Sequence, residues 1–415
     1  MKIAIIGSGI SGLTCGHLLH KQHDITLFEA NDYIGGHTHT VDVSVANNTH
    51  AIDTGFIVFN DRTYPLFLRL LSRIGITPQP TDMSFSVRHS ITGLEYNGHD
   101  LDTLFAQRSN LFSPQFYRFI AEIMRFNKQT KADLAQNNIS DRLTLGEYLE
   151  QHQFSEFFCQ HYVLPMGAAI WSASINDIRA FPLSFFLTFF NNHGLLSVTH
   201  RPQWYVIPGG SRSYIAPLTY GWREKIHLST PVQAVQRTSN TVQILTQYGE
   251  QCFDEVIFAC HSDQALALLT DATQEEKKIL GNISYRTNDV TLHTDVQLLP
   301  KRKKAWASWN YLLDNNHEQP ALVTYDMNRL QHVESQTRFC ITLNRSETIH
   351  SDKIIQQFNY AHPQFTLSAI NAQKQRHLIC GKQHTHFCGA YWYNGFHEDG
   401  VRSANDVCSR FGEAL

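Results

Sequence analysis

The chain has 415 residues, more than one ordinary domain contains and enough for two hydrophobic cores. Its formal net charge is −3, which does not indicate a nucleic-acid partner. No stretch reaches about 18 consecutive apolar residues, so no membrane-spanning helix is predicted. The cysteines form no C-x-x-C pair, which is typical of reduced thiols in a cytoplasmic protein.

The chain begins with a pattern of strand, glycine turn and helix. The apolar run from Ile3 to Ile6 predicts a strand buried on both faces of a parallel sheet. Gly7, Gly9 and Gly12 follow with G-x-G-x-x-G spacing, which suits a tight turn, a closely approaching pyrophosphate and a closely packed helix, in that order. The helix is expected from Ser11 to Lys21, with its free N–H groups toward the phosphates. We therefore expect no secretory signal peptide at this end.

A second predicted strand, Ile25 to Phe28, ends at Glu29. Glu29 lies about 20 residues after Gly9, the distance at which an acidic side chain bonds the ribose hydroxyls of a dinucleotide. A complete βαβ unit with a terminal acid is a stronger signal than the glycines alone. We therefore predict a dinucleotide site.

Two further motifs follow. Glu29-Ala30 is followed by Gly35-Gly36-His37, and the next predicted strand carries Ile52-Asp53-Thr54-Gly55-Phe56. Together they resemble the superfamily of flavin amine oxidases, protoporphyrinogen oxidases and phytoene desaturases. That family has G-G-R, whose Arg contacts the FAD phosphates; His37 stands in its place and removes a fixed positive charge. The G-G-H-T-H-T and D-T-G-F-I-V-F-N versions resemble a narrower bacterial branch of FAD-dependent oxidoreductases, which is similar to the N-terminal flavin region of plant cyclopropane-fatty-acid synthases.

Later segments extend the resemblance. Trp204 to Tyr214 contains the second Gly-Gly segment, and Val232 stands where the family places an adenine-binding backbone. The string from Gly395 to Ala404 resembles the C-terminal flavin signature, a helix whose N-terminus points toward the flavin. The resemblance implies an FAD cofactor held by Gly7, Ser8, Gly9, Ile10, Ser11, Gly12, Glu29, Ala30, Gly36, His37, Thr38, Thr54, Gly55, Phe56, Val232, Gly389, Glu398, Asp399, Gly400, Val401 and Ala404.

The fold class implied is α/β, a Rossmann-like FAD-binding domain with an inserted α+β substrate domain. We expect the FAD-binding domain to comprise residues 1–75, 205–285 and 380–415. A mostly helical cap is expected over 76–204 and a substrate-domain sheet over 286–379.

Several local signals lie in and before the cap. Asp61 is a candidate cap for a helix that ends at Arg73, and Ser113-Pro114 starts another helix. Thr144 to Glu147 has a capping-box pattern, and residues 83–96 read as a hairpin. The apolar stripe of residues 185–190 is either core packing, the wall of a lipid-sized tunnel or a membrane-touching face.

The resemblance implies an FAD-dependent oxidase, dehydrogenase or desaturase that moves a hydride from a hydrophobic substrate to flavin N5. A modified fatty acyl chain is the preferred substrate. Amine oxidation is an alternative, because Tyr391-Trp392-Tyr393 offers aromatic rings; a non-catalytic flavoprotein that serves a lipid-modifying enzyme is another. No catalytic residue is assigned. The candidates considered are His261, His293 and His397 as bases, with Trp306 and Trp309 as pocket walls.

The expected partner is a hydrophobic small molecule or a lipid. The basic turn Lys301 to Lys304 is either solvated surface or a contact with phospholipid head groups, so a cytoplasmic location with peripheral contact to the inner membrane face is considered. The pairs His37-x-His39 and His384-x-His386 have no completing cluster, so no metal site is predicted.

Overall fold

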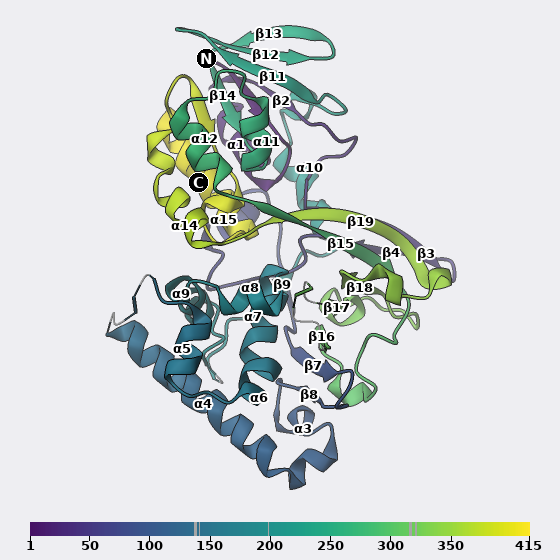
Figure 1. Cartoon of the computed structure of the whole chain (residues 1–415). Coiled ribbons are helices and arrows are strands. Elements are labelled where there is room, and N and C mark those ends of the chain that lie inside the picture. The colour runs from purple at the N-terminus through teal and green to yellow at the C-terminus, as the bar shows by residue number, and fades with distance from the viewer. Residues whose placement is uncertain (137–138, 141, 198, 315–317, 320–321) are drawn as a thin grey trace.

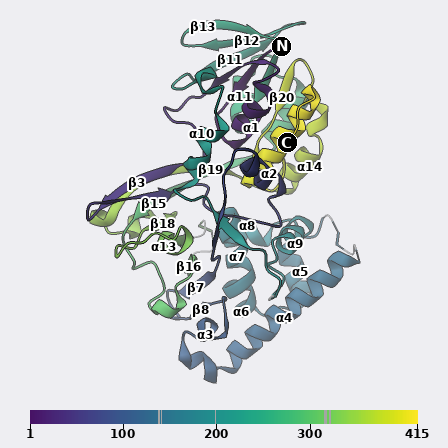
Figure 2. The ribbon, with the colours of Figure 1, turned by 180° about the vertical axis from the view of Figure 1, so that it is seen from behind.

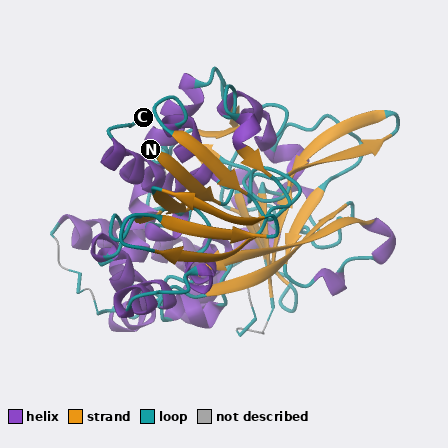
Figure 3. Ribbon diagram, turned by 90° about the horizontal axis from the view of Figure 1, so that it is seen from above, coloured by secondary structure: helices purple, strands orange, loops and turns teal. Residues whose placement is uncertain are grey.

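The computed structural model describes residues 1–136, 139–140, 142–197, 199–314, 318–319 and 322–415. It has two lobes (Figure 1), with both ends of the chain in the upper lobe and a group of helices with a large sheet in the lower one. The view from behind shows the same division (Figure 2). Seen from above, strands run through the middle and many helices gather near the chain ends (Figure 3).

A parallel five-stranded sheet forms the centre of the upper lobe, in the order β10-β2-β1-β14-β20. Ile3, Ala4 and Ile5 are fully buried there, as an apolar run in a parallel sheet covered on both faces should be. The predicted first strands are found, and the helix after them, α1 (Ile10–Leu19), ends two residues earlier than expected. The strands are β1 (Lys2–Ile6), β2 (Asp24–Phe28), β10 (Ile226–His227), β14 (Glu255–Phe258) and β20 (Thr385–Phe387).

Further elements complete the upper lobe. An antiparallel meander lies beside the parallel sheet, and Arg237 on its first strand is buried with Glu276, at 2.5 Å between Nη1 and Oε1. The strands are β11 (Val232–Arg237), β12 (Val242–Thr246) and β13 (Gly249–Phe253). The helices are α2 (Pro65–Arg73), α10 (Ile215–Leu218), α11 (Ser262–Leu268), α12 (Gln274–Gly281), α14 (Leu367–Lys374) and α15 (His397–Cys408).

A mixed seven-stranded sheet, β19-β15-β18-β17-β16-β7-β8, forms one side of the lower lobe. The hairpin predicted over residues 83–96 is present as β7 and β8, and it joins this sheet because β7 pairs in parallel with β16. The expected division into a helical cap and a separate sheet is therefore not strict. The strands are β7 (Phe85–His89), β8 (Glu95–Asn97), β15 (Tyr285–His293), β16 (Trp309–Leu313), β17 (Leu322–Asp326), β18 (Cys340–Leu343) and β19 (Ile354–Pro363), with α13 (Met327–Leu330) after β17.

Helices make up the other side of the lower lobe. Ser113 caps α4 through its hydroxyl, and Thr144 and Glu147 form the predicted capping box at α5. The helices are α3 (Leu101–Leu104), α4 (Pro114–Ala135), α5 (Leu145–Gln151), α6 (Glu156–Phe158), α7 (Leu164–Trp171), α8 (Ile175–Arg179) and α9 (Leu183–Asn192). In α9, Phe186, Leu187, Phe189 and Phe190 are buried, and the three phenylalanines pack around Trp171, so these residues are core packing and do not form a membrane-touching face; Phe189 also lines a cavity described below.

A long pair of antiparallel strands connects the two lobes, and short strand pairs complete the fold. β15 and β19 pair over nine residues of β15 and run between the lobes (Figure 1). After β19 the chain returns to the upper core at α14, where Ala369 and Ala372 are buried, earlier than the boundary expected at 379. The remaining strands are β3 (Thr40–Val45) with β4 (Asn48–Asp53), and β5 (Phe59–Asn60) and β6 (Gln79–Thr81), which both pair with β9 (Trp204–Val206).

Candidate cofactor site

The three glycines after β1 serve three different purposes. Gly7 has a φ of +105°, and its N–H donates to the Phe28 carbonyl at 2.8 Å, so the chain turns sharply at the strand end. A Cβ on Gly12 would lie 1.9 Å from the Gly7 oxygen, so only glycine lets α1 pack this closely. A Cβ on Gly9 would meet nothing within 4 Å. Gly9 therefore borders open space, as expected where a pyrophosphate approaches the backbone.

The C-terminal helix packs directly against this turn. The Ser11 hydroxyl donates to the Gly400 carbonyl at 3.0 Å, across 389 residues of sequence. A Cβ on Gly400 would lie 2.6 Å from Cγ2 of Ile10, and Val401 and Ala404 are fully buried. The beginnings of α1 and α15 therefore lie side by side in one lobe, so both helix N-termini can face one extended ligand.

The Gly35-Gly36 loop crosses over the turn. Gly36 has a φ of +58°, and its Cβ position is 3.2 Å from the Gly9 Cα. The Gly35 N–H donates to the Ser8 hydroxyl at 3.2 Å. Ala30 begins this loop and is exposed, whereas Thr38 at its end is buried.

Glu29 lies at the end of β2, as predicted, and is held by four hydrogen bonds. Its Oε2 accepts from the Ser8 N–H at 2.8 Å and the Ser8 hydroxyl at 2.6 Å, and its Oε1 accepts from the backbone and side chain of Asn31. The Thr230 N–H donates to the Glu29 carbonyl at 2.8 Å, which brings the half-buried Val232 segment to the same sheet edge. Two of the four donors to the carboxylate are rotatable side chains that ribose hydroxyls can replace.

His37 is partly buried and uncharged near neutral pH. Burial lowers the pKa of His37 to about 4, with His261 as a second cause. Its Nε2 has no hydrogen-bond partner among the described residues, and its ring lies 5.4 Å from that of His362 and 5.1 Å from that of Tyr360. The position therefore carries no fixed positive charge near neutral pH, and a phosphate must be held mainly by N–H groups and helix dipoles.

His397, a candidate base, is fixed on all sides. Its ring stacks on Phe56 at 3.6 Å between centroids, and its Nε2 lies 2.7 Å from the Tyr214 hydroxyl. That hydroxyl also bonds the Thr38 hydroxyl. Burial lowers the pKa of His397 well below its ordinary value, so the ring is a neutral part of the wall. Close packing continues at Gly55, where a Cβ would lie 2.2 Å from the His37 oxygen.

Glu398 and Asp399 are capping groups. Glu398 accepts from the N–H groups of Leu66 at 3.1 Å and Phe67 at 2.8 Å, so it caps α2 from another helix. The predicted cap, Asp61, was wrong, because α2 begins at Pro65 and its N-cap residue makes no side-chain bond. Asp399 accepts from the Phe396 N–H at 2.9 Å and caps its own helix. Burial raises the pKa of both carboxyls to about 7.

The segment before α15 is also fixed. The Gly389 N–H donates to the Ser403 hydroxyl at 2.8 Å, which ties the end of β20 to α15. Tyr391 and Trp392 are each 3% exposed and belong to the upper core, with ring centroids 4.9 Å apart. Tyr393 donates to Asp406 at 2.5 Å. Of the three rings, Tyr391 and Trp392 are therefore core residues.

Three other candidates have structural partners. His293 is fully buried in the seven-stranded sheet, with Nε2 2.7 Å from the Thr342 hydroxyl and Nδ1 accepting from the Asp295 N–H. Burial lowers the pKa of His261 to about 4, and its ring stacks on Tyr285 at 4.4 Å. Trp306 donates to the Pro300 carbonyl at 2.7 Å.

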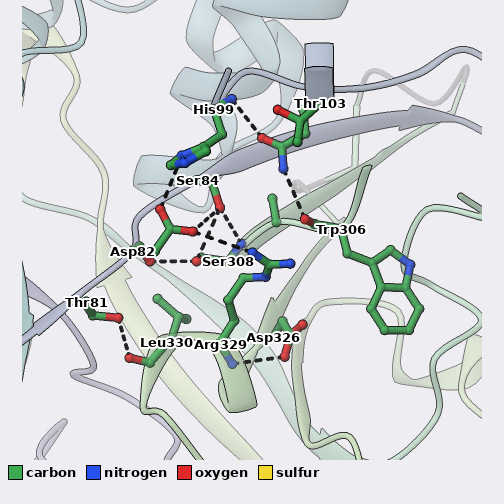
Figure 4. Close-up of polar contacts among 12 residues, drawn as sticks. Thr81, Asp82, Ser84, His99, Thr103, Trp306, Ser308, Asp326, Arg329 and Leu330 are labelled. Carbon is green, nitrogen blue, oxygen red and sulfur yellow. Dashed lines mark hydrogen bonds and ion pairs between the residues drawn. The ribbon is translucent and has the colours of Figure 1, made fainter. Parts of the chain in front are cut away.

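Figure 4 shows the surroundings of Trp306, where Asp82, Ser84 and Ser308 form a polar network at the ends of β7 and β16. Trp309 packs edge-on against Tyr325 at 5.2 Å. Both tryptophans therefore fit a structural role. The paired His384 and His386 each contact Glu255 at 3.2 Å, and no group of three such ligands that could hold a metal ion exists among the described residues.

Asp53 is a site residue that the sequence reasoning did not select. It is fully buried and accepts from the backbone and hydroxyl of Ser211 at 2.9 and 2.8 Å, and from Gln331 at 2.8 Å. Burial raises its pKa to about 6. It joins the second Gly-Gly turn to β4. Its place in the I-D-T-G-F motif was the available signal.

A cavity of about 380 Å³ opens where α2, α9 and α15 meet. Its apolar wall includes Phe189 and Phe396, whose rings stack at 5.0 Å, and Phe396 directly precedes α15. Arg62 and Arg402, both exposed, also line it. A second cavity, of about 500 Å³, lies beside Gly209 and Gly210, between β4 and the segment after α13. Cavities of this size suit small-molecule ligands.

Fold and site together define a flavoprotein oxidoreductase: a dinucleotide turn, a return loop over it and a C-terminal helix that closes on both. A family model described as flavin containing amine oxidoreductase matches residues 10–410, and the chain belongs to this family. FAD is its cofactor. The open space at Gly9, the unpartnered Nε2 of His37 and the paired helix N-termini fit that group. When bound, FAD supplies the redox chemistry by accepting a hydride.

Solved structures share the fold over nearly the whole chain. A fatty acid isomerase from P. acnes that produces CLA is 15% identical, with a TM-score of 0.69 and coverage of 99% of this chain and 98% of that one. Cyclohexylamine oxidase from Brevibacterium oxydans is 15% identical, with a TM-score of 0.70 and coverage of 99% and 98%. A putrescine oxidase with bound putrescine is 12% identical, with a TM-score of 0.70 and coverage of 99% of both chains.

Proposed function

We propose that the protein is an FAD-dependent oxidoreductase that removes a hydride from a hydrophobic substrate with an anionic head, specifically a modified fatty acyl chain that ends in a carboxylate. The observation that carries this proposal is the cavity at the start of α15. Its aromatic wall of Phe189 and Phe396 suits an apolar chain, and Arg62 and Arg402 at its surface suit a carboxylate.

The exposed charges at the cavity are those of Arg62 and Arg402 and favour an anionic head, whereas Glu398 and Asp399 also line it but are buried. The buried carboxyls of Glu398 and Asp399 accept hydrogen bonds from backbone N–H groups, and the pKa of each is raised to about 7. The exposed charges are the two guanidinium groups. Arg62 donates to the His200 carbonyl at 2.6 Å, and Arg402 lies 4.1 Å from the Tyr393 ring centroid. Each guanidinium keeps further N–H donors for a ligand.

The test is anaerobic bleaching of the flavin in the purified holoprotein. Long-chain acyl carboxylates are expected to bleach it, and their methyl esters to do so with a KM at least about tenfold higher, because a charge-assisted hydrogen bond contributes about 1.5–3 kcal/mol. Arg62→Gln and Arg402→Gln should raise the KM of the acid but not of the ester. An equal effect on acid and ester would show that the arginines do not bind the head group.

Amine oxidation is the second candidate. Two amine oxidases share the fold at TM-scores of 0.70. Amine oxidation predicts that amines bleach the flavin and that peroxide is released in air. It also predicts that acyl carboxylates do not bleach the flavin. The third hypothesis is a non-catalytic flavoprotein that serves a lipid-modifying partner. It predicts a yellow protein whose flavin is not bleached by any amine or acyl lipid.

A further inference from the structure

One end of the lower lobe exposes apolar side chains close together. Phe112 is 88% exposed and Leu101 is 76% exposed, and Leu111 and Tyr117 are exposed as well. Phe112 and Leu111 end the short helix of residues 108–112 that leads into α4, and the Tyr117 hydroxyl donates to the Leu111 carbonyl at 3.1 Å. Single exposed apolar residues are ordinary, but a group at one end of a molecule marks a contact surface.

The exposed face of α4 continues this surface. Met124 lies seven residues after Tyr117, so both side chains point to the same side of the helix, about 10 Å apart. Both are half exposed. The opposite face buries Phe116, Phe119 and Phe126 in the lower core. The helix is therefore anchored on one face and offers apolar groups on the other. Figures 1 and 2 show α4 along the outer edge of the lower lobe.

This face of α4 is strongly basic. Arg118, Arg125, Lys128 and Lys131 are exposed on it. Between Leu111 and Ala132, all of which the structure describes, Glu122 is the one acidic residue, and it is buried and bonded to Ser155. Arg118 and Lys128 have no hydrogen bond or ion pair with any described residue. The whole chain has a net charge of −3, so this positive face is a local feature.

The basic turn Lys301 to Lys304 adjoins the same end. Lys304 forms an ion pair with Asp102 of α3, and Asp102 also pairs with Arg108 at 2.6 Å. Arg302 pairs with Glu95 of β8 at 3.0 Å. The four residues of the turn are exposed. We define the interfacial face as Leu101, Leu111, Phe112, Tyr117, Met124, Arg118, Arg125, Lys128, Lys131 and the turn Lys301–Lys304.

We propose that the interfacial face docks on the surface of a bilayer containing anionic phospholipids. Lysines and arginines beside exposed apolar side chains on an anchored helix are the pattern of helices that lie in a membrane interface. Among the described residues no helix is long and apolar enough to cross a bilayer, so the contact is with its surface. This inference does not depend on the substrate proposed above.

The test is co-sedimentation of the holoprotein with vesicles of phosphatidylglycerol and phosphatidylcholine, and with vesicles of phosphatidylcholine alone. Binding is expected to the anionic vesicles and should weaken as salt is added. Since each basic residue at an anionic surface contributes about fivefold, Arg118→Glu with Lys128→Glu should weaken binding at least about 25-fold. Phe112→Ser should weaken it about tenfold.

Matched controls separate the face from the overall charge. Lys277→Glu with Lys278→Glu makes the same charge change on the exposed side of α12, and Tyr248→Ser removes an aromatic ring that is 75% exposed elsewhere. Both should bind as the unaltered protein does. All these positions are exposed, so the flavin spectrum should report intact folding in every variant. Equal affinity for both vesicle types, no sedimentation with either, or equal losses in face and control variants would each overturn the proposal.

Discussion

Replacing Gly9 with alanine should remove FAD and leave the folded chain intact. Gly9 has φ −65° and ψ 176°, a conformation that alanine adopts without strain, and its Cβ would meet nothing within 4 Å. Alanine is a poorer N-cap than glycine by roughly 0.5–1 kcal/mol. It also restricts the unfolded chain, which stabilises the fold by about 0.4–1 kcal/mol. The two effects nearly cancel, so the free energy of unfolding without cofactor should change by less than about 1 kcal/mol.

The same methyl group takes the space that a pyrophosphate needs. Non-bonded heavy atoms pack best about 3.5–4.0 Å apart, so the phosphates must move away from the N–H groups of α1. We expect flavin occupancy to fall at least about tenfold, equivalent to 1.4 kcal/mol or more. The assay is flavin absorbance per protein after purification, with chemical denaturation of the flavin-free form.

Gly98→Ala is the matched control, because Gly98 is exposed after β8 and its Cβ would also meet nothing within 4 Å. The control should keep its flavin. Full flavin content in Gly9→Ala would refute the assignment of this turn to the cofactor. If the free energy of unfolding of flavin-free Gly9→Ala fell strongly, the space around Gly9 could not be open.

Three further predictions concern stability. Gly12→Ala should lower the free energy of unfolding by about 3 kcal/mol or more, because its Cβ would lie 1.9 Å from the Gly7 oxygen; an unchanged denaturation midpoint would contradict this. Arg237→Met should lower the free energy of unfolding by about 3–5 kcal/mol, because the Glu276 carboxylate stays buried without its partner. The flavin spectrum should be unchanged, and a loss below about 1 kcal/mol would contradict the prediction. Acidification from pH 6.5 toward 4 should destabilise the protein by about 2 kcal/mol per pH unit in urea titrations, and rising stability over that window would show the reasoning wrong. Its sign follows from histidines whose pKa values are lowered by desolvation and which therefore bind protons mainly when unfolded: His37, His193, His261, His293, His362 and His397. These histidines outnumber the carboxyls of raised pKa, which act in the opposite direction: Asp53, Asp326, Glu398 and Asp399.

Local patterns predicted the first part of the fold well. The run Ile3 to Ile6, the three glycines and Glu29 determine one βαβ unit through contacts between near neighbours, and each is found in its expected place. The cap at Ser113 and the box at Thr144 were equally readable, because capping depends on residues within one helical turn. The placement of β7 and β8 in the large sheet could not be predicted from local patterns. β7 pairs in parallel with β16, which lies more than 200 residues later in the chain.

The missed parts of the site have the same cause. Glu398 was selected for the cofactor, and the structure shows that its carboxylate also caps α2 from 332 residues away in sequence; nothing near Asp61 indicates that partner. His37 and His362 belong to segments separated by most of the chain, yet their rings lie 5.4 Å apart. Both pairings depend on the order in which distant segments of the chain enter the two lobes. Local sequence propensity does not determine such long-range contacts.

The contact between Ser11 and Gly400 constrains how the protein is made. Gly400 follows Ser11 by 389 residues, so a nascent chain that has formed its first strand and helix must wait for nearly all the rest of the sequence before α15 can cover them. Until then the surface of α1 that will hold Gly400 stays open to solvent and to chaperones. Long sequence separation of this kind slows folding. Flavin capture should therefore be among the last events in biosynthesis, after both lobes have been translated.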